Sequence, residues 1–256
     1  MRIDLDRPIR VFACDIDGCL AAVDHAPYDL ERLHAIAELN RASASDPTVP
    51  SLTFVTGRPH GYVDAFMQAV EVRLPASFEN GAGLATRVPY RAWLSPATLR
   101  GRRLVADAER VLGERDDVFV QLGKVASLSV FPTDPAWPVP ELTDMLAGLL
   151  DRHGLPLDVD PSTGCVNLLL RGIDKATGFL DLCEVEGLDP AQVGGIGDAV
   201  GDLPWLRHCG VSFAPTNALD EVRAAVTHAV DLPDVAATLA AYEALVAANR
   251  TIAGPG

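Results

Sequence analysis

The sequence predicts an α/β protein whose central sheet is parallel and covered by helices on both faces. Three short apolar runs, at residues 11–14, 52–55 and 193–196, lack polar alternation, as expected of strands that are buried on both sides. Apolar residues at helical spacing follow the first two runs, at residues 30–39 and 63–70. The chain of 256 residues, 48% of them hydrophobic, is long enough to bury a substantial core.

The first apolar run leads into two acids, Asp15 and Asp17, and a turn at Gly18. Ligands of open α/β sheets bind beyond the carboxyl ends of the strands, so we expect a site here. Two carboxylates two residues apart point to one side while the chain stays extended, and Gly18 then lets it turn away sharply. This stretch alone is also compatible with a solvated acidic turn.

The second run ends in Thr56, Gly57 and Arg58, just before the helical spacing at residues 63–70. Backbone N–H groups at a helix start favour an anion, and a threonine hydroxyl can donate to a phosphoryl oxygen. The alternative is that Thr56 is an ordinary strand or cap residue and that Arg58 is solvated.

The pattern changes after a tight-turn signal at Asn80 and Gly81. Candidate strands lie at residues 90–94, 118–122, 127–131, 157–160 and 166–170, and candidate helices at 96–112 and 140–153. Two strand pairs and two helices predict an inserted α+β domain with an antiparallel sheet. We expect this insertion at residues 84–170 and a discontinuous core at residues 1–83 and 171–256.

The first pattern returns in the last third of the chain. Asp174 can cap a helix that begins with Lys175, and the third apolar run leads into Asp198 and Asp202. A further strand is expected at residues 211–213, with helices at 219–226 and 235–249. Lys175 taken alone would be a solvated helix residue.

Four acids are therefore expected at neighbouring strand ends. Two carboxylates about 5 Å apart repel by roughly 3 kcal/mol at an effective dielectric constant of about 20, so a cluster of them requires a cation. Hard oxygen ligands select Mg²⁺. The predicted metal-site residues are Asp15, Asp17, Asp198 and Asp202.

Composition limits the partners. A net charge of −14 disfavours nucleic acid, whose binding needs basic patches, and any phosphorylated substrate would need positive charge supplied locally. No signal peptide or membrane span is visible, so the cytoplasm is the expected compartment. The five cysteines contain no CxxC pair and are expected to be reduced, mostly buried thiols. The sequence predicts no oligomeric state.

The order DxDGxL, TGR, a lone lysine and GDxxxD resembles the haloacid-dehalogenase-like (HAD) hydrolase superfamily, phosphatase branch, across nearly the whole chain. The insertion resembles the large α/β cap of the Cof-type sugar-phosphatase group. Within that group, Phe78-Glu-Asn-Gly81 and Arg171-Gly-Ile-Asp-Lys175 look most like archaeal-type phosphoglycolate phosphatases, a weaker match. The resemblance implies a Rossmann-like core with a mobile cap.

The resemblance also implies roles for the two acids of the first turn. Asp15 would attack phosphorus to form an aspartyl-phosphate, and Asp17 would protonate the leaving oxygen and later activate water. Mg²⁺ would be held by Asp15, the Asp17 carbonyl and Asp198, while Asp202 would orient the metal's waters or Lys175. The implied phosphate-binding residues are Thr56, Gly57, Arg58 and Lys175.

Two positions depart from the family pattern, Cys19 where Thr or Val is common and Gly201 where Asn is frequent. The first is expected to change only turn packing, and the second to weaken support of the metal. Substrate selectivity is assigned to residues that can reach over the site. These are Asn80, Arg87, Arg91 and Lys124. The alternative is that at least two of the three basic residues are simply solvated.

The resulting hypothesis is a Mg²⁺-dependent phosphatase acting on a sugar phosphate or a phosphoglycolate-like phospho-acid. A phosphomutase of the same superfamily is the enzymatic alternative, and it predicts activation by a sugar bisphosphate with little phosphate release. A non-catalytic phosphoacceptor protein is the alternative of another class. Such a protein needs neither the inserted cap nor an acid/base at Asp17.

Overall fold

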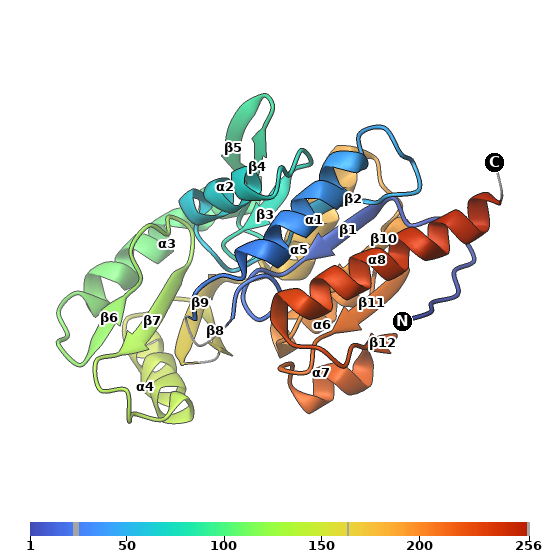
Figure 1. Ribbon diagram of the computed structural model, residues 1–256. Helices are drawn as coiled ribbons and strands as arrows, with labels where there is room; N and C mark the ends of the chain where they lie inside the picture. Colours follow the sequence, from blue (N-terminus) through green and yellow to red (C-terminus); the bar gives the residue numbers. More distant parts are fainter. Residues whose placement is uncertain (23–25, 163, 255–256) are drawn as a thin grey trace.

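The computed structural model describes residues 1–22, 26–162 and 164–254 and contains three sheets (Figure 1). The largest is a five-stranded parallel sheet with the order β12-β11-β10-β1-β2. This confirms the predicted α/β class, and the three apolar runs form neighbouring strands. The strands are β1 (Val11–Cys14), β2 (Ser51–Phe54), β10 (Val193–Ile196), β11 (Val211–Ala214) and β12 (His228–Ala229).

Helices cover both faces of this sheet because successive residues of its strands point to opposite sides. Phe12 and Cys14 pack toward α1 (Leu30–Ala42), α2 (His60–Ala69) and α8 (Asp234–Ala253), whereas Val11 and Ala13 pack toward α5 (Lys175–Glu186) and α6 (Leu203–Leu206). In the described part of the chain, no helix is both long and apolar enough to cross a membrane. The remaining short elements of this half are η1 (Pro190–Gln192), η2 (Val200–Asp202) and α7 (Asp220–Ala225).

A three-stranded antiparallel sheet lies beside the core. It consists of β3 (Ala76–Phe78), β4 (Gly83–Arg87) and β5 (Tyr90–Leu94). The strand predicted at residues 90–94 is present as β5, and it pairs with β4 rather than with the four-stranded sheet. No prediction covered β3 or β4. Both are too short, and too close to a turn, to show a clear period.

The third sheet has four antiparallel strands in the order β6-β7-β9-β8 and forms the left lobe in Figure 1. Val130 and Leu168 pack with α3 (Pro96–Leu112) and α4 (Val139–Arg152), while Ser129 and Asn167 point the other way, toward a cavity. The sheet therefore has one apolar face and one polar face. Its strands are β6 (Val118–Val120), β7 (Leu128–Pro132), β8 (Leu157–Ser162) and β9 (Cys165–Leu170). The predicted domain limits at 84 and 170 stay a prediction. We call the lobe formed by this sheet with α3 and α4 the cap.

The turn between β3 and β4 packs directly on the start of α5. Glu79, Asn80 and Gly81 all have positive φ, and a Cβ built on Gly81 would lie 2.0 Å from the Asp174 carbonyl oxygen. Gly178 faces the same turn, since its Cβ would lie 2.4 Å from the Gly81 Cα. Two glycines thus allow α5 to approach the turn, which sets the position of Lys175 at the helix start.

We expect Gly81→Ala to destabilise the protein more than Gly172→Ala. Both glycines have positive φ, which costs an alanine roughly 1–2 kcal/mol. Only at Gly81 does the new methyl group also clash with backbone atoms, so Gly81→Ala should lower the free energy of unfolding by about 3 kcal/mol or more. Urea unfolding of the two variants measures the difference. Equal losses would show that the approach of the turn to α5 carries no strain.

Candidate active site

Asp15 and Asp17 lie where β1 ends, at the carboxyl edge of the parallel sheet. The Asp15 side chain is nearly buried, and its Oδ1 accepts a hydrogen bond of 2.7 Å from the Ile16 backbone N–H. Gly18 turns the chain away, and a Cβ at this position would lie 2.0 Å from the Asp198 Oδ2. A side chain larger than hydrogen at residue 18 would therefore displace Asp198.

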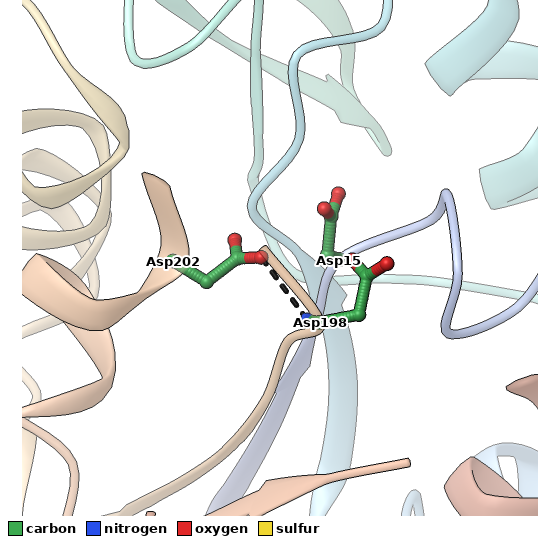
Figure 2. Close-up of side chains that lie close together, drawn as sticks. All are labelled: Asp15, Asp198 and Asp202. Atoms are coloured by element: carbon green, nitrogen blue, oxygen red, sulfur yellow. Dashed lines mark hydrogen bonds between the residues drawn. The ribbon is translucent and has the colours of Figure 1, made fainter. Parts of the chain in front are cut away.

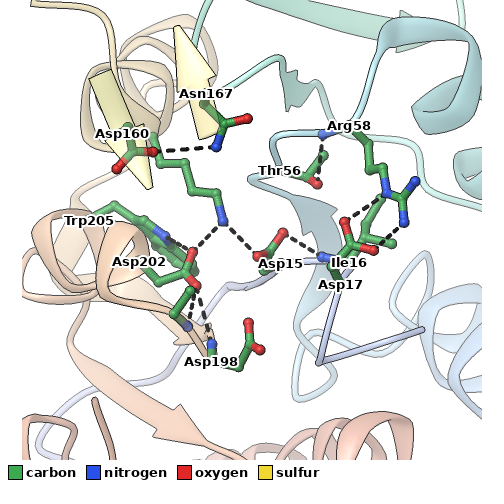
Figure 3. A network of polar contacts seen from close by, with 12 residues as sticks. Asp15, Ile16, Asp17, Thr56, Arg58, Asp160, Asn167, Asp198, Asp202 and Trp205 are labelled. Carbon is green, nitrogen blue, oxygen red and sulfur yellow. Dashed lines mark hydrogen bonds and ion pairs between the residues drawn. The ribbon is translucent and has the colours of Figure 1, made fainter. Parts of the chain in front are cut away.

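Lys175 connects two of the buried acids (Figure 3). Its Nζ donates to Asp15 Oδ2 at 2.6 Å and to Asp202 Oδ1 at 2.7 Å. Burial opposes the charge of Lys175, but the two carboxylates outweigh it and raise the lysine pKa above its ordinary value. Asp202 is fully buried and also accepts from the Trp205 indole at 3.0 Å and from the Asp198 and Ala199 backbone N–H groups.

Asp198 completes a cluster of three acids (Figure 2). One carboxylate oxygen each of Asp15, Asp198 and Asp202 lies within 4.8 Å of the others. Burial raises the pKa of Asp198 to about 8, and the charges of Asp15 and Asp202 add to the effect. Burial also raises the pKa of Asp15 to about 7, although Lys175 acts in the opposite direction. Such a set of hard, mutually repelling oxygen donors fits a divalent cation such as Mg²⁺.

Arg58 pairs with Asp17 rather than remaining in solvent. Its Nε donates to Asp17 Oδ2 at 2.7 Å, its Nη2 donates to the other oxygen, and its guanidinium stacks on Tyr62 at 4.5 Å. This two-point contact turns the Asp17 carboxylate away from the cluster of Asp15, Asp198 and Asp202. The Asp17 side chain remains about one-third exposed. Thr56 is buried, and its hydroxyl accepts from the Arg58 backbone N–H at 3.2 Å.

A cavity of about 180 Å³ lies between these residues and the polar face of the cap sheet. Pockets for drug-sized ligands have roughly 300–1,000 Å³, so this one suits a smaller molecule. Lys124 lines it from the loop between β6 and β7, and the lysine Nζ donates to Ser129 Oγ at 2.6 Å. Ser129 Oγ in turn donates to Asn167 Oδ1 at 2.6 Å. Burial lowers the pKa of Lys124 to about 8.

The four residues predicted to determine specificity differ in their positions. Asn80 and Lys124 line the cavity, and the buried Asn80 Nδ2 has no hydrogen-bond partner among the described residues. Arg87 instead donates to Asp64, and the exposed Arg91 lies over Trp93. Neither arginine is among the described residues that line the cavity. The hairpin of β4 and β5 carries both away from it.

Several residues at the site were not predicted to belong to it. Asn167 lines the cavity from β9, and its signal in the sequence was a polar residue inside an otherwise apolar strand. Asn217 supports the first acidic turn, since its Nδ2 donates to the Gly18 carbonyl at 2.9 Å. No local pattern relates Asn217 to Gly18, because 199 residues separate them.

The two departures from the family pattern differ in their surroundings. Cys19 is fully buried in the core cluster beneath the acidic turn, so its thiol acts in packing. At Gly201 a Cβ would meet nothing within 4 Å. A side chain at residue 201 would therefore extend into open space.

The comparisons with known proteins agree with this arrangement. Residues 158–237 match the family described as haloacid dehalogenase-like hydrolase. The chain is therefore similar to the HAD-like hydrolases in this region. A Thermoplasma acidophilum crystal structure shares the fold, with a TM-score of 0.73 and 19% identity over 93% of this chain and 99% of that one. The chain thus shares the fold of this solved structure.

Several curated relatives of this chain are named phosphoglycolate phosphatase, among them the following two. The Methanococcoides burtonii protein is 23% identical over 86% of this chain and 89% of its own length. The Methanopyrus kandleri protein is 34% identical, but over only 34% of this chain and 36% of its own length. These relatives and the family match support assignment of the enzyme as a phosphatase.

We expect Mg²⁺ to stabilise the protein through the three-acid cluster. At a concentration about a hundredfold above its dissociation constant, an ion that binds only the folded state adds about 2.7 kcal/mol, or roughly 5–10 °C in Tm. Thermal unfolding with MgCl₂, against NaCl at equal ionic strength, measures the shift. Asp198→Asn should remove most of it. An equal shift in this variant would exclude the cluster as the metal site.

Proposed function

We propose that this protein is a Mg²⁺-dependent phosphatase of the HAD type that transfers the phosphoryl group of a small metabolite to Asp15 and then to water. The observation that carries the proposal is the buried Asp15 carboxylate, held by Lys175 at 2.6 Å beside Asp198 and open to the cavity beneath the cap. We place the reaction in the cytoplasm, in line with the free thiols of all five cysteines.

Asp15 acts as the nucleophile in this proposal. Its Oδ1 is held by the Ile16 N–H and its Oδ2 by Lys175, so the carboxylate is oriented before substrate arrives. Attack forms an Asp15–phosphorus bond and breaks the bond from phosphorus to the leaving alkoxide oxygen. Water then attacks phosphorus, releasing phosphate and restoring the carboxylate.

Asp17 acts as the acid and base. It lies two residues beyond the nucleophile at the mouth of the cavity, and Arg58 holds it by two hydrogen bonds. A phosphoryl group that accepts hydrogen bonds from Arg58 competes with Asp17 for the guanidinium. Substrate binding thereby releases Asp17 to donate a proton to the leaving oxygen and later to take one from water.

Positively charged groups and N–H donors compensate for the negative charge of the phosphoryl group. Lys175 donates to both Asp15 and Asp202. Its ammonium group therefore lies beside the attacking oxygen of Asp15, where it can also donate to a phosphoryl oxygen. Thr56 and Gly57 supply a hydroxyl and a backbone N–H from the adjacent loop. The Nδ2 of Asn80, which has no hydrogen-bond partner in the described part of the chain, is a further donor at the cavity.

The metal would be held by Asp15 and Asp198, with the Asp17 carbonyl as a further ligand. When bound, Mg²⁺ neutralises charge on the carboxylates and on the phosphoryl oxygens. Asp202 is better suited to a positioning role than to direct ligation. Its two oxygens already accept from Lys175, Trp205 and two backbone N–H groups.

The substrate in this proposal is a small phospho-acid, which carries a carboxylate in addition to its phosphate, rather than a sugar phosphate with an uncharged sugar. Lys124 is a cation that lines the cavity from the cap, and among the described residues it donates only to Ser129. An ammonium group has three N–H donors, so two are available to a carboxylate on the substrate. The names of the two phosphoglycolate phosphatase relatives agree with this substrate class.

We expect Asp15→Asn and Asp17→Asn to stop phosphate release from 2-phosphoglycolate. Loss of an acid/base lowers kcat by roughly 10²–10⁴-fold, and loss of the nucleophile by at least as much. Phosphate release with and without Mg²⁺ measures both variants. The exposed Asp189, which pairs with Arg7, supplies the control variant Asp189→Asn, which should keep full activity.

The same assay separates the proposal from its alternatives. A phosphomutase would release little phosphate and respond to a sugar bisphosphate. A phosphoacceptor protein would become labelled without turnover. Parent-like rates in both Asp15→Asn and Asp17→Asn would contradict the mechanism.

We expect the preference for a phospho-acid to fall as pH rises through about 8. Burial lowers the pKa of Lys124 to about 8, so the ammonium is largely charged at about pH 7 and largely neutral at about pH 9. The ratio of kcat/KM for 2-phosphoglycolate to that for glycerol 2-phosphate should fall several-fold over this range. Both phosphates remain dianionic there, so their ionisation cancels in the ratio.

Two variants of Lys124 sharpen this measurement. Lys124→Met should have a low ratio at every pH, because the charge is gone. Lys124→Arg should keep a ratio that does not fall, because guanidinium stays protonated. A parent ratio that is constant with pH would contradict an anion-binding role for Lys124.

A further inference from the structure

Glu79 is a buried acid outside the catalytic cluster. It lies in the turn between β3 and β4 with φ of 48°, and none of the residue is exposed to solvent. A buried carboxylate needs hydrogen bonds or charge to compensate for lost hydration. The structure supplies these from the cap, more than 40 residues further along the chain.

The Glu79 carboxylate accepts hydrogen bonds from consecutive backbone N–H groups of the loop between β6 and β7. Its Oε2 accepts from Ala126 at 2.8 Å and from Val125 and Ser127 at 3.1 Å. The Ser127 hydroxyl adds a longer contact of 3.3 Å. Bonds from N–H groups to an ionised carboxylate are among the stronger hydrogen bonds in proteins.

The bonded loop carries Lys124, the residue immediately before Val125. Ser129 holds the lysine Nζ from the other end at 2.6 Å. Lys124 is therefore fixed between the Glu79 anchor and the start of β7. The negative charge of Glu79 also favours the charged form of Lys124.

The backbone of the same turn holds the phosphate-binding loop. The Glu79 N–H donates to the Arg58 carbonyl at 3.0 Å, and the Asn80 N–H donates to the Thr56 carbonyl at 3.0 Å. One residue thus touches the loop at the phosphate end of the cavity with its backbone. It touches the loop at the Lys124 end with its side chain.

We propose that Glu79 is a positioning residue that sets the separation between the phosphate-binding loop and Lys124, and hence the length of phospho-acid that fits between them. This inference rests on the proposed function. It assigns to Glu79 no contact with substrate. Its effect is exerted through the loop that carries Lys124.

The anchor itself is tested without any activity measurement. Glu79→Gln removes the negative charge and replaces one accepting oxygen by an NH₂ group, which weakens the hydrogen bonds from the loop. Exchange of the backbone amides of residues 125–127 should therefore accelerate about tenfold or more. Glu79→Asp keeps the charge but is one methylene shorter, and provides a second variant if the first does not fold. Glu71→Gln is the matched control, because Glu71 also has positive φ but pairs with Arg41. Unchanged exchange in both Glu79 variants would overturn the anchor.

Positioning is tested by a double-mutant cycle with Lys124→Met. Glu79→Gln should raise KM for 2-phosphoglycolate about tenfold, with little change in kcat or in the KM of glycerol 2-phosphate. In the Lys124→Met background, Glu79→Gln should have no further effect on the ratio of the two kcat/KM values. Additive effects, or an equal loss for both substrates, would reduce Glu79 to a structural residue and overturn the inference. Absence of phosphate release by the unmodified protein would instead contradict the proposed function. Amide exchange would still show whether Glu79 holds residues 125–127.

Discussion

The ammonium group of Lys175 lies between two buried carboxylates, Asp15 and Asp202, and much of the fold serves to keep it there. Burying three charges is unfavourable unless each is paired and hydrogen-bonded. Asp202 is accordingly saturated by the Trp205 indole and two backbone N–H groups. The helix that carries Lys175 begins at a capping box on Asp174 and approaches the β3–β4 turn through glycine contacts.

The cavity joins two different kinds of sheet. In the parallel sheet both faces are covered, so the charged groups lie where the strands end, at Asp15 and Asp198. In the cap sheet one face packs on α3 and α4, and alternate residues such as Ser129 and Asn167 are left for the cavity. The site therefore combines strand ends from the core with a strand face from the cap. Glu79 connects core and cap, because its backbone N–H donates to the Arg58 carbonyl and its carboxylate accepts from the N–H groups of the cap loop.

The parallel core was predictable because its physical signal is local. Strands buried on both faces read as short apolar runs, and the acids that follow them must lie at one edge of the sheet. The strands β3 and β4 were not predicted, because three to five residues beside a turn are too few to show an alternation of apolar and polar residues. Arg87 and Arg91 lie outside the cavity lining because β5 pairs with β4, a pairing that was not visible from the sequence. Lys124 and Asn80, by contrast, do line the cavity.

The sequence by itself determined the fold class, the order of the polar strand ends and the identity of the acids, because these depend on burial pattern and residue type. Only the tertiary structure decided which partner each charged group takes. Arg58 pairs with Asp17, 41 residues away, and Lys175 with Asp15, 160 residues away. Such pairs depend on distances of a few ångströms between segments remote in the chain. Packing sets those distances, and no local pattern records them.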